Sequence, residues 1–320
     1  MEAQAAANDV DGRFADGIED YVARFRAQPP AAGLAGIRLA GDMAADRFGG
    51  ADADVRSFDT FICAPGREIG VRIHDPGGSG RRPGICYFHG GGFTLGSVES
   101  FAVASAALAE ATGAVVASVQ YRRLPESGYA DAQADCDLAF AWLAQQAPLL
   151  GIDPERIAVA GDSAGALFAL ACAANSRDAG TARPAAMILF YGTFAMDPER
   201  PAYRTAADPL LTEARIRDYV ALFTRCGGLD GRPAPLDRAD LAGLPPTHVV
   251  AAEHDPLRSE AEQFAARLAA AGVTVTSRVA PGMIHGFLRA VRLSGAARSE
   301  LDKAAEAVRP LLRPDRERPE

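Results

Sequence analysis

Cysteine is sparse in this chain of 320 residues. The five cysteines are an odd number, and no two of them are separated by only two residues. This argues against a framework of disulfides and against a zinc ribbon. Cys86, Cys136 and Cys172 lie among apolar residues, where cysteine usually acts as a small buried hydrophobe. Because the N-terminus also lacks a secretory signal pattern, we expect a cytoplasmic protein.

Long apolar runs and blocks of basic residues are also missing. No stretch of about 18 uninterrupted apolar residues occurs, so we expect no transmembrane segment. The 33 Lys and Arg residues against 41 Asp and Glu residues give a formal net charge of −8. Binding to nucleic acid or to an anionic membrane needs clustered positive charge, which makes the chain a poor candidate for either. A small-molecule substrate stays open, and the net charge does not choose one.

What the sequence does contain is a regular alternation of strand-like and helix-like segments. Two strand patterns at 55–75, joined by the turn signal Pro65-Gly66, resemble a hairpin. From residue 84 onward strands and helices alternate, which is typical of a mostly parallel sheet covered by helices on both faces. The expected strands are 84–90, 114–121, 156–163, 185–192, 247–255 and 273–282, and the expected helices are 98–112, 130–146, 165–177, 257–271 and 295–312.

Two regions stand outside this alternation. Residues 10–27 have apolar residues at helical spacing, and 31–54 has a weaker helical pattern. More than fifty residues separate the strands 185–192 and 247–255, and they include a helix-like segment at 212–226. This exceeds an ordinary connection and predicts an insertion. Insertions at the carboxyl ends of parallel strands lie over the ligand crevice, so a lid or cap is our hypothesis.

The most specific motif is Gly161-Asp162-Ser163-Ala164-Gly165, which matches G-x-S-x-G. An apolar strand pattern precedes it and an Ala- and Leu-rich helix pattern follows it. A sharp strand-to-helix turn needs small residues beside the serine, because the two backbones nearly touch there. An ordinary strand-to-helix turn is the alternative. The context favours a nucleophilic Ser163.

A second motif, His89-Gly90-Gly91-Gly92-Phe93, follows the strand at 84–90. Consecutive glycines let the backbone present its N–H groups to a ligand without side-chain obstruction. The motif lacks the lysine of a P-loop and the spacing of G-x-G-x-x-G, so a phosphate loop is the weaker interpretation. We interpret it as an oxyanion loop in which His89 has a structural role.

The serine needs a base, and the base needs an orienting carboxylate. His285 follows the last expected strand and Asp255 ends the strand 247–255, so both are expected at the sheet edge that carries Ser163. The order Ser163, Asp255, His285 matches that of α/β-hydrolases. Asp255 before Pro256 also fits a helix N-cap, and we treat the two roles as a conflict that the motif decides for catalysis.

The other histidines are assigned elsewhere. We expect His74 to be an exposed strand residue, His248 to be satisfied locally, and His254 to point to the opposite side of the chain from Asp255.

These motifs together resemble the bacterial hormone-sensitive-lipase-like esterases of the α/β-hydrolase superfamily. HGGGF at 89–93, GDSAG at 161–165, DPL at 255–257 and PGMIHGF at 281–287 are similar to that family's motifs in order and spacing. The resemblance covers about 55–312. It implies an α/β-hydrolase fold with a central sheet of about eight strands and a helical cap. The implied domains are 1–54 and 193–240 for the cap, and 55–192 and 241–320 for the core.

The resemblance also implies an activity and a site. It implies hydrolysis of short- to medium-chain carboxylic esters, with Ser163, Asp255 and His285 as catalytic residues. The backbone N–H groups of Gly90, Gly91 and Ala164 would bind the oxyanion, and His89, Gly92 and Asp162 would support the motifs. Neither a metal nor an organic cofactor is needed for this chemistry. The cap aromatics are expected to form the cap core rather than contact substrate: Phe14, Tyr21, Phe25, Phe194, Tyr203, Tyr219 and Phe223.

Some points stay open. Arg123 replaces a small or apolar residue of the family pattern, and it could face solvent or alter the pocket rim. An amidase or deacetylase would use the same triad, and a binding protein without activity would be expected to lack part of it. The alternating strand at 273–282 is a possible sheet edge for a homodimer, unless Arg278 and the loops protect it.

Overall fold

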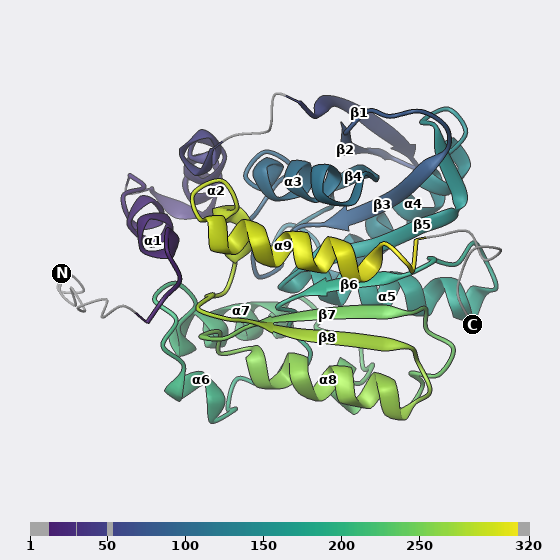
Figure 1. Ribbon diagram of the computed structural model, residues 1–320. Helices are drawn as coiled ribbons and strands as arrows, with labels where there is room; N and C mark the ends of the chain where they lie inside the picture. Colours follow the sequence, from purple (N-terminus) through teal and green to yellow (C-terminus); the bar gives the residue numbers. More distant parts are fainter. Residues whose placement is uncertain (1–12, 30, 50–53, 313–320) are drawn as a thin grey trace.

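The computed structural model describes residues 13–29, 31–49 and 54–312 (Figure 1). Within these ranges the chain forms one eight-stranded sheet in the order β1-β2-β4-β3-β5-β6-β7-β8. The strands are β1 (Arg56–Ala64), β2 (Arg67–Asp75), β3 (Arg82–Phe88), β4 (Val115–Gln120), β5 (Ile152–Asp162), β6 (Met187–Phe190), β7 (Thr247–Ala252) and β8 (Val275–Ala280).

The register confirms the predicted mixture of one hairpin and a parallel body. β1 and β2 pair antiparallel around the turn at Pro65 and Gly66, and β2 pairs antiparallel with β4. All later pairs are parallel. The carboxyl ends of β3, β5, β7 and β8 therefore meet at one edge of the sheet, where the loops with the predicted site residues begin.

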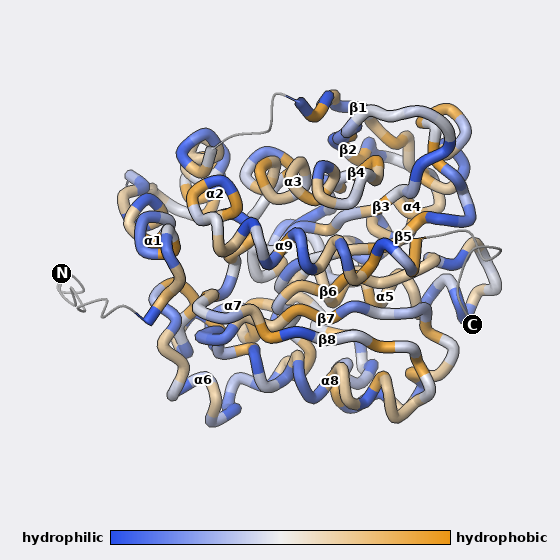
Figure 2. Tube along the Cα trace, in the orientation of Figure 1, coloured by the Kyte–Doolittle hydropathy of each residue, from blue (hydrophilic) through white to orange (hydrophobic). Residues whose placement is uncertain are grey.

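Helices cover both faces of the sheet, as predicted (Figure 1). One face packs against α3 (Ala102–Thr112) and α9 (Gly295–Val308), and the other packs against α4 (Tyr129–Gln146), α5 (Ala164–Ala179) and α8 (Arg258–Ala270). Figure 2 shows hydrophobic residues along β6 and β7, which precede the edge strand β8 in the order of the sheet, whereas α9 alternates between hydrophilic and hydrophobic residues. This alternation is what a helix with one buried face requires.

The remaining helices gather at one end of the sheet, at the left of Figure 1. They are α1 (Ile18–Arg26), α2 (Gly33–Met43), α6 (Ala202–Thr205) and α7 (Glu213–Arg225), with the short 3₁₀ turn η1 (Ala45–Phe48). A second 3₁₀ turn, η2 (Pro235–Asp237), packs against α8 instead. The helix expected from residue 10 begins at Ile18, after Gly17 with φ 80°; residues 10–12 lie outside the described ranges. The described parts of the two segments predicted to form the cap, 1–54 and 193–240, thus lie at the same end of the sheet.

His74 is buried, so its predicted exposure is wrong. The side chain is 0% exposed, with Nδ1 2.8 Å from Ser57 Oγ and Nε2 2.9 Å from Ser105 Oγ. The reason is that β2 lies between β1 and β4 while α3 covers its face. Burial lowers the pKa of His74 to about 4, so the ring is neutral at pH 7.

Two other expectations concern surfaces. β8 is the last strand of the sheet, and Arg278 on it pairs with Glu300 of α9. Pairing of a second copy along this edge stays a prediction.

Among the helices in the described ranges, none combines the length and hydropathy needed to cross a lipid bilayer.

Two leucines give a matched test of the packing on the α8 face. Leu268 of α8 is 0% exposed in the core, whereas Leu149 is 83% exposed. Leu268→Ala should lower the free energy of unfolding by about 2–5 kcal/mol, because it removes buried methyl groups and leaves a cavity. Leu149→Ala should change it by less than about 0.5 kcal/mol. Denaturant unfolding of both variants measures this, and equal losses would contradict the packing.

Candidate active site

Ser163 sits on the sharp turn between β5 and α5. Its backbone has φ 53° and ψ −120°, a strained conformation for a residue with a side chain. A Cβ on Gly165 would lie 1.9 Å from the carbonyl oxygen of Phe88, and one on Gly161 would lie 2.2 Å from that of Gly165. Only glycine fits at either position. The turn at 161–165, the elbow, packs against the end of β3, and its own strand and helix backbones nearly touch.

The structure brings the three predicted catalytic side chains into one chain of contacts. Ser163 Oγ lies 2.8 Å from His285 Nε2, and His285 Nδ1 lies 2.7 Å from Asp255 Oδ2. The three residues follow β5, β8 and β7, whose carboxyl ends share one edge of the sheet. Asp255 is 4% exposed, so little water competes for its contact with His285.

The expected conflict between the two roles of Asp255 does not exist. Its Oδ1 accepts a hydrogen bond from the N–H of Leu257 at 2.8 Å, while Oδ2 faces His285. Each carboxylate oxygen serves one role. The helix α8 begins only at Arg258, with Leu257 as its N-cap. Asp255 therefore stabilises the turn that precedes the helix and is not itself the N-cap.

A second buried carboxylate, which we did not predict, contacts the same histidine. Asp208, in the insertion between α6 and α7, accepts the backbone N–H of His285 at 2.6 Å with Oδ2. Its Oδ1 accepts the N–H groups of Leu210 and Leu211, both at 2.8 Å. Burial and then the charge of Asp255 raise the pKa of Asp208 to about 6.

The two aspartates share a local sequence. Asp208-Pro209-Leu210 and Asp255-Pro256-Leu257 both use Oδ1 to hold the N–H two residues later and Oδ2 to hold His285. The repeated Asp-Pro-Leu was the signal in the sequence that could have identified Asp208.

Two opposing effects act on the imidazole of His285. Burial lowers its pKa, whereas the charge of Asp255, the hydrogen bond to it and the charge of Asp208 raise it. The attraction outweighs the burial, so the pKa of His285 lies above its ordinary value. The ring is therefore able to hold a proton taken from a neighbour.

His89 fixes the backbone of residues 89–96, the glycine loop, consistent with a structural role. Its Nδ1 lies 2.8 Å from the carbonyl oxygen of Gly90, and its ring stacks on Tyr121 with centroids 4.3 Å apart. The hydroxyl of Tyr121 donates to the carbonyl oxygen of His89 at 2.6 Å. Burial lowers the pKa of His89 to about 3, so its ring stays neutral and is a poor base.

The structure contradicts Gly90 as an oxyanion donor. Its N–H donates to Asp162 Oδ1 at 2.8 Å, and the hydroxyl of Tyr87 donates to the same oxygen at 2.6 Å. The N–H of Gly90 is thus already used inside the protein. Three other residues, Gly91, Gly92 and Ala164, line the cavity beside Ser163. Gly92, expected only to support the motif, is thus also part of the cavity wall.

Arg123 neither faces solvent nor lines the cavity. The side chain is half-buried, and its Nη1 donates to the carbonyl oxygen of Gly96, at the end of the glycine loop. It therefore braces the loop from behind, which neither of the two earlier interpretations included.

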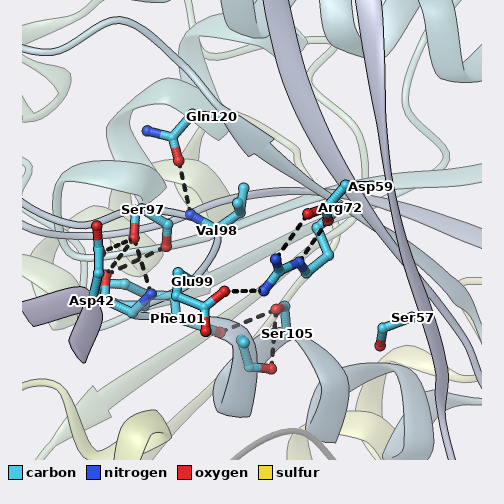
Figure 3. Close-up of polar contacts among 12 residues, drawn as sticks. Asp42, Ser57, Asp59, Arg72, Ser97, Val98, Glu99, Phe101, Ser105 and Gln120 are labelled. Atoms are coloured by element: carbon cyan, nitrogen blue, oxygen red, sulfur yellow. Dashed lines mark hydrogen bonds and ion pairs between the residues drawn. The ribbon is translucent and has the colours of Figure 1, made fainter. Parts of the chain in front are cut away.

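The segment 97–101, directly after this loop, is anchored on three sides (Figure 3). Ser97 Oγ donates to Asp42 of α2, the N–H of Val98 donates to Gln120 of β4 at 2.9 Å, and Glu99 pairs with Arg72 of β2 at 2.6 Å. The segment 97–101 thereby joins the helix α2 to the strands β2 and β4.

The cavity that contains Ser163 and His285 lies between the carboxyl ends of the strands and the helices α1, α2 and α7. It holds about 1260 Å³, including the solvent at its mouth. Tyr21, Phe25 and Tyr219 line it, and Tyr21 also packs against Phe48 in the core, so these rings belong to the cavity wall as well as to the packing of the helices. Phe194, Tyr203 and Phe223 are buried as expected, and so are Cys86, Cys136 and Cys172. In the described ranges no group of three or more His, Cys, Asp or Glu side chains gathers where it could hold a metal ion.

The remaining histidines lie outside this cavity. His248 Nδ1 lies 2.8 Å from Thr276 Oγ1, a local contact as expected, although its buried Nε2 has no hydrogen-bond partner in the described part of the chain. His254 Nε2 lies 3.0 Å from the carbonyl oxygen of Arg13, away from the triad.

The role of Asp208 can be tested without any activity assay. Asp208→Asn removes a negative charge that raises the pKa of His285, so this pKa should fall and the ring should stay neutral to lower pH. An NMR titration of the imidazole measures it. Asp302→Asn on α9, which removes a carboxylate paired with Arg298, is the control and should leave the pKa unchanged. An unaltered pKa in Asp208→Asn would contradict the assignment.

Comparisons with known proteins find esterases of similar sequence and fold. Carboxylesterase NlhH of Mycobacterium tuberculosis is 35% identical over 254 residues, covering 77% of this chain and 79% of that protein. Ethyl acetate hydrolase of Pseudomonas putida is 31% identical, covering 76% and 79%. Among solved structures, a hyperthermophilic esterase of Pyrobaculum calidifontis superposes with a TM-score of 0.82 at 30% identity, covering 91% of this chain and 96% of that one.

The family assignment rests on most of the chain. The family described as alpha/beta hydrolase fold matches residues 85–289, which include the glycine loop, the elbow, Asp255 and His285. The chain therefore belongs to the α/β-hydrolase fold family, and within it to the hormone-sensitive-lipase-like esterases that its motifs resemble.

Proposed function

We propose that the protein is a serine carboxylesterase that hydrolyses short- to medium-chain carboxylic esters through an acyl-enzyme. The observation that carries the proposal is the contact chain from Ser163 Oγ through His285 to Asp255, at 2.8 and 2.7 Å. The activity in the names of the relatives, carboxylesterase and ethyl acetate hydrolase, supports the same chemistry.

In the first step Ser163 is the nucleophile. His285 Nε2 takes the hydroxyl proton as Oγ attacks the ester carbonyl, and a tetrahedral intermediate forms. Asp255 holds the other ring nitrogen, Nδ1, in its protonated form and stabilises the positive charge on the ring. The raised pKa of His285 suits this step, because the ring must hold the proton until the alcohol leaves.

The negative charge of the intermediate develops on the former carbonyl oxygen. We assign its stabilisation to the backbone N–H groups of Gly91, Gly92 and Ala164, which line the cavity beside Ser163. Ala164 is the first residue of α5, where N–H groups have no partner within the helix. One such donor typically lowers the barrier by about 3–4 kcal/mol.

The second step reverses the proton transfers. The alcohol leaves with the proton from His285, which gives the Ser163 acyl-enzyme. His285 then takes a proton from water as the water attacks the acyl carbon, and returns that proton to Ser163 Oγ as the acid leaves. Every bond change uses the same three side chains.

The chain-length preference follows from the covering of the cavity. Residues of α1, α2 and α7 line it opposite the sheet edge, which supports 1–54 and 193–240 as two parts of one cap. Bulky side chains such as Tyr21, Phe25 and Tyr219 limit the room for an acyl chain. Amide hydrolysis would use the same groups, but the names of the relatives favour esters.

Loss of the Ser163 hydroxyl is the direct test. Ser163→Ala should lower kcat/KM for p-nitrophenyl butyrate by about 1,000-fold or more, because only binding and the oxyanion donors remain. Its thermal unfolding should stay close to that of the unmodified protein. Ser277→Ala, an exposed serine on β8, is the matched control and should keep full activity. Turnover by Ser163→Ala near that of the control would refute the proposal.

A further inference from the structure

Arg289 is a buried cation in the wall of the cavity that contains Ser163. It belongs to η3 (Phe287–Ala290), directly after His285, and its side chain lines the cavity while the residue is only 8% exposed. Its Nε and Nη2 are buried, and neither has a hydrogen-bond acceptor within the part of the chain that the structure describes.

Aromatic rings compensate this charge only in part. The guanidinium carbon lies 4.5 Å from the ring centroid of Phe48, 5.2 Å from that of Phe101 and 5.9 Å from that of Phe25. Such contacts attract a cation, but ring faces give the N–H donors no oxygen to bind. Buried charges in proteins are normally paired, so an unpaired guanidinium beside a cavity points to an anionic ligand.

The other charged side chains of the cavity wall are Arg38, Arg215 and Asp162. Arg38 is paired with Glu126 at 2.8 Å. Asp162 accepts hydrogen bonds from Tyr87 and Gly90, and its charge attracts Arg289 without a hydrogen bond between the two side chains. Arg215 is exposed, and its guanidinium carbon lies 6.0 Å from the centroid of the Phe25 ring.

The two arginines of the wall without a carboxylate partner, Arg289 and Arg215, therefore outnumber the one carboxylate, Asp162. The wall is positive, although the net charge of the chain is −8. Two further carboxylates lie close by but are not among the residues that line the cavity. Asp208 and Asp255 are both directed at His285.

We infer that the preferred substrates are carboxylic esters that carry a second, negatively charged carboxylate, and that Arg289 binds this group. A guanidinium forms strong charge-assisted hydrogen bonds with a carboxylate, and the edge of Arg289 that lines the cavity is the part that would form them. Arg215, near Phe25 and exposed, would attract the same charge as the substrate enters. This inference rests on the proposed esterase function and adds a substrate class to it.

Arg289 is held in place before any substrate binds. Phe101, one of the rings it faces, ends the anchored segment 97–101 (Figure 3). Phe48 and Phe25 come from the cap and face the same guanidinium. A fixed guanidinium loses little side-chain entropy on binding, which favours affinity for the carboxylate.

The test compares esters that differ only in the second charge. One pair is mono-p-nitrophenyl adipate and its methyl ester, with the charge on the acyl side. The other pair is 4-acetoxybenzoate and its methyl ester, with the charge on the alcohol side. The readout is the ratio of kcat/KM for the anionic ester to that for the neutral ester in each pair.

We expect this ratio to be well above one in at least one pair, which also identifies the side that Arg289 binds. Arg289→Gln should lower that ratio about 10- to 100-fold, the usual effect of losing a hydrogen bond to a charged group. Arg289→Lys should keep part of the preference, because it keeps the charge but loses the planar guanidinium. Arg309→Gln, an exposed arginine after α9, is the matched control and should leave the ratio unchanged.

Two results would overturn the inference. One is a ratio at or below one in both pairs for the unmodified protein, which needs no variant to fold. The other is a preference that Arg289→Gln retains in full, as expected if Arg289 only packs against the three rings. Either result with normal hydrolysis of p-nitrophenyl butyrate refutes the substrate class alone, whereas no hydrolysis of any ester refutes the proposed function itself.

Discussion

Asp162 joins the two loops from which the site is built. Its Oδ1 accepts hydrogen bonds from Tyr87 at the end of β3 and from Gly90 in the glycine loop, and the next residue along the chain is Ser163. Burial raises the pKa of Asp162 to about 6, so at neutral pH it is a buried carboxylate that needs both donors. The position of the serine and the direction of the glycine loop are therefore set together. The contact of Gly165 with Phe88 makes the same connection through the backbone.

The segment between β6 and β7 is connected to the rest of the chain by buried carboxylates as well. Asp208 holds the backbone of His285 from the insertion, whereas Glu260 of α8 accepts the N–H groups of Phe194 and Ala195 and the hydroxyl of Tyr203. Burial raises the pKa of Glu260, and the donated hydrogen bonds oppose this only in part. Backbone donors of the insertion thus satisfy acidic groups of the core, and the reverse holds for Asp208. The covering of the cavity and the orientation of the histidine consequently depend on each other.

Much of this arrangement could be predicted from the sequence, because strand ends and short motifs are local. The order Ser163, Asp255, His285 required only that parallel strands share one edge. Which of three consecutive glycines faces the cavity depends on loop dihedrals, such as φ 119° at Gly91 and 58° at Gly92, and a run of identical residues does not encode them. The burial of His74 depends on the order of the strands in the sheet. The surroundings of the Arg289 guanidinium depend on aromatic rings from three segments that are distant in the sequence. Such long-range contacts leave no local pattern.

The most direct test of the account is the structure of the protein inhibited by a p-nitrophenyl alkylphosphonate. We predict a covalent bond from phosphorus to Ser163 Oγ, with the phosphoryl oxygen about 2.7–3.1 Å from the N–H groups of Gly91, Gly92 and Ala164. Gly90 should still donate to Asp162, and His285 should stay between Ser163 and Asp255. An adduct on another residue, or a phosphoryl oxygen bound by Gly90 in place of Gly92, would contradict it.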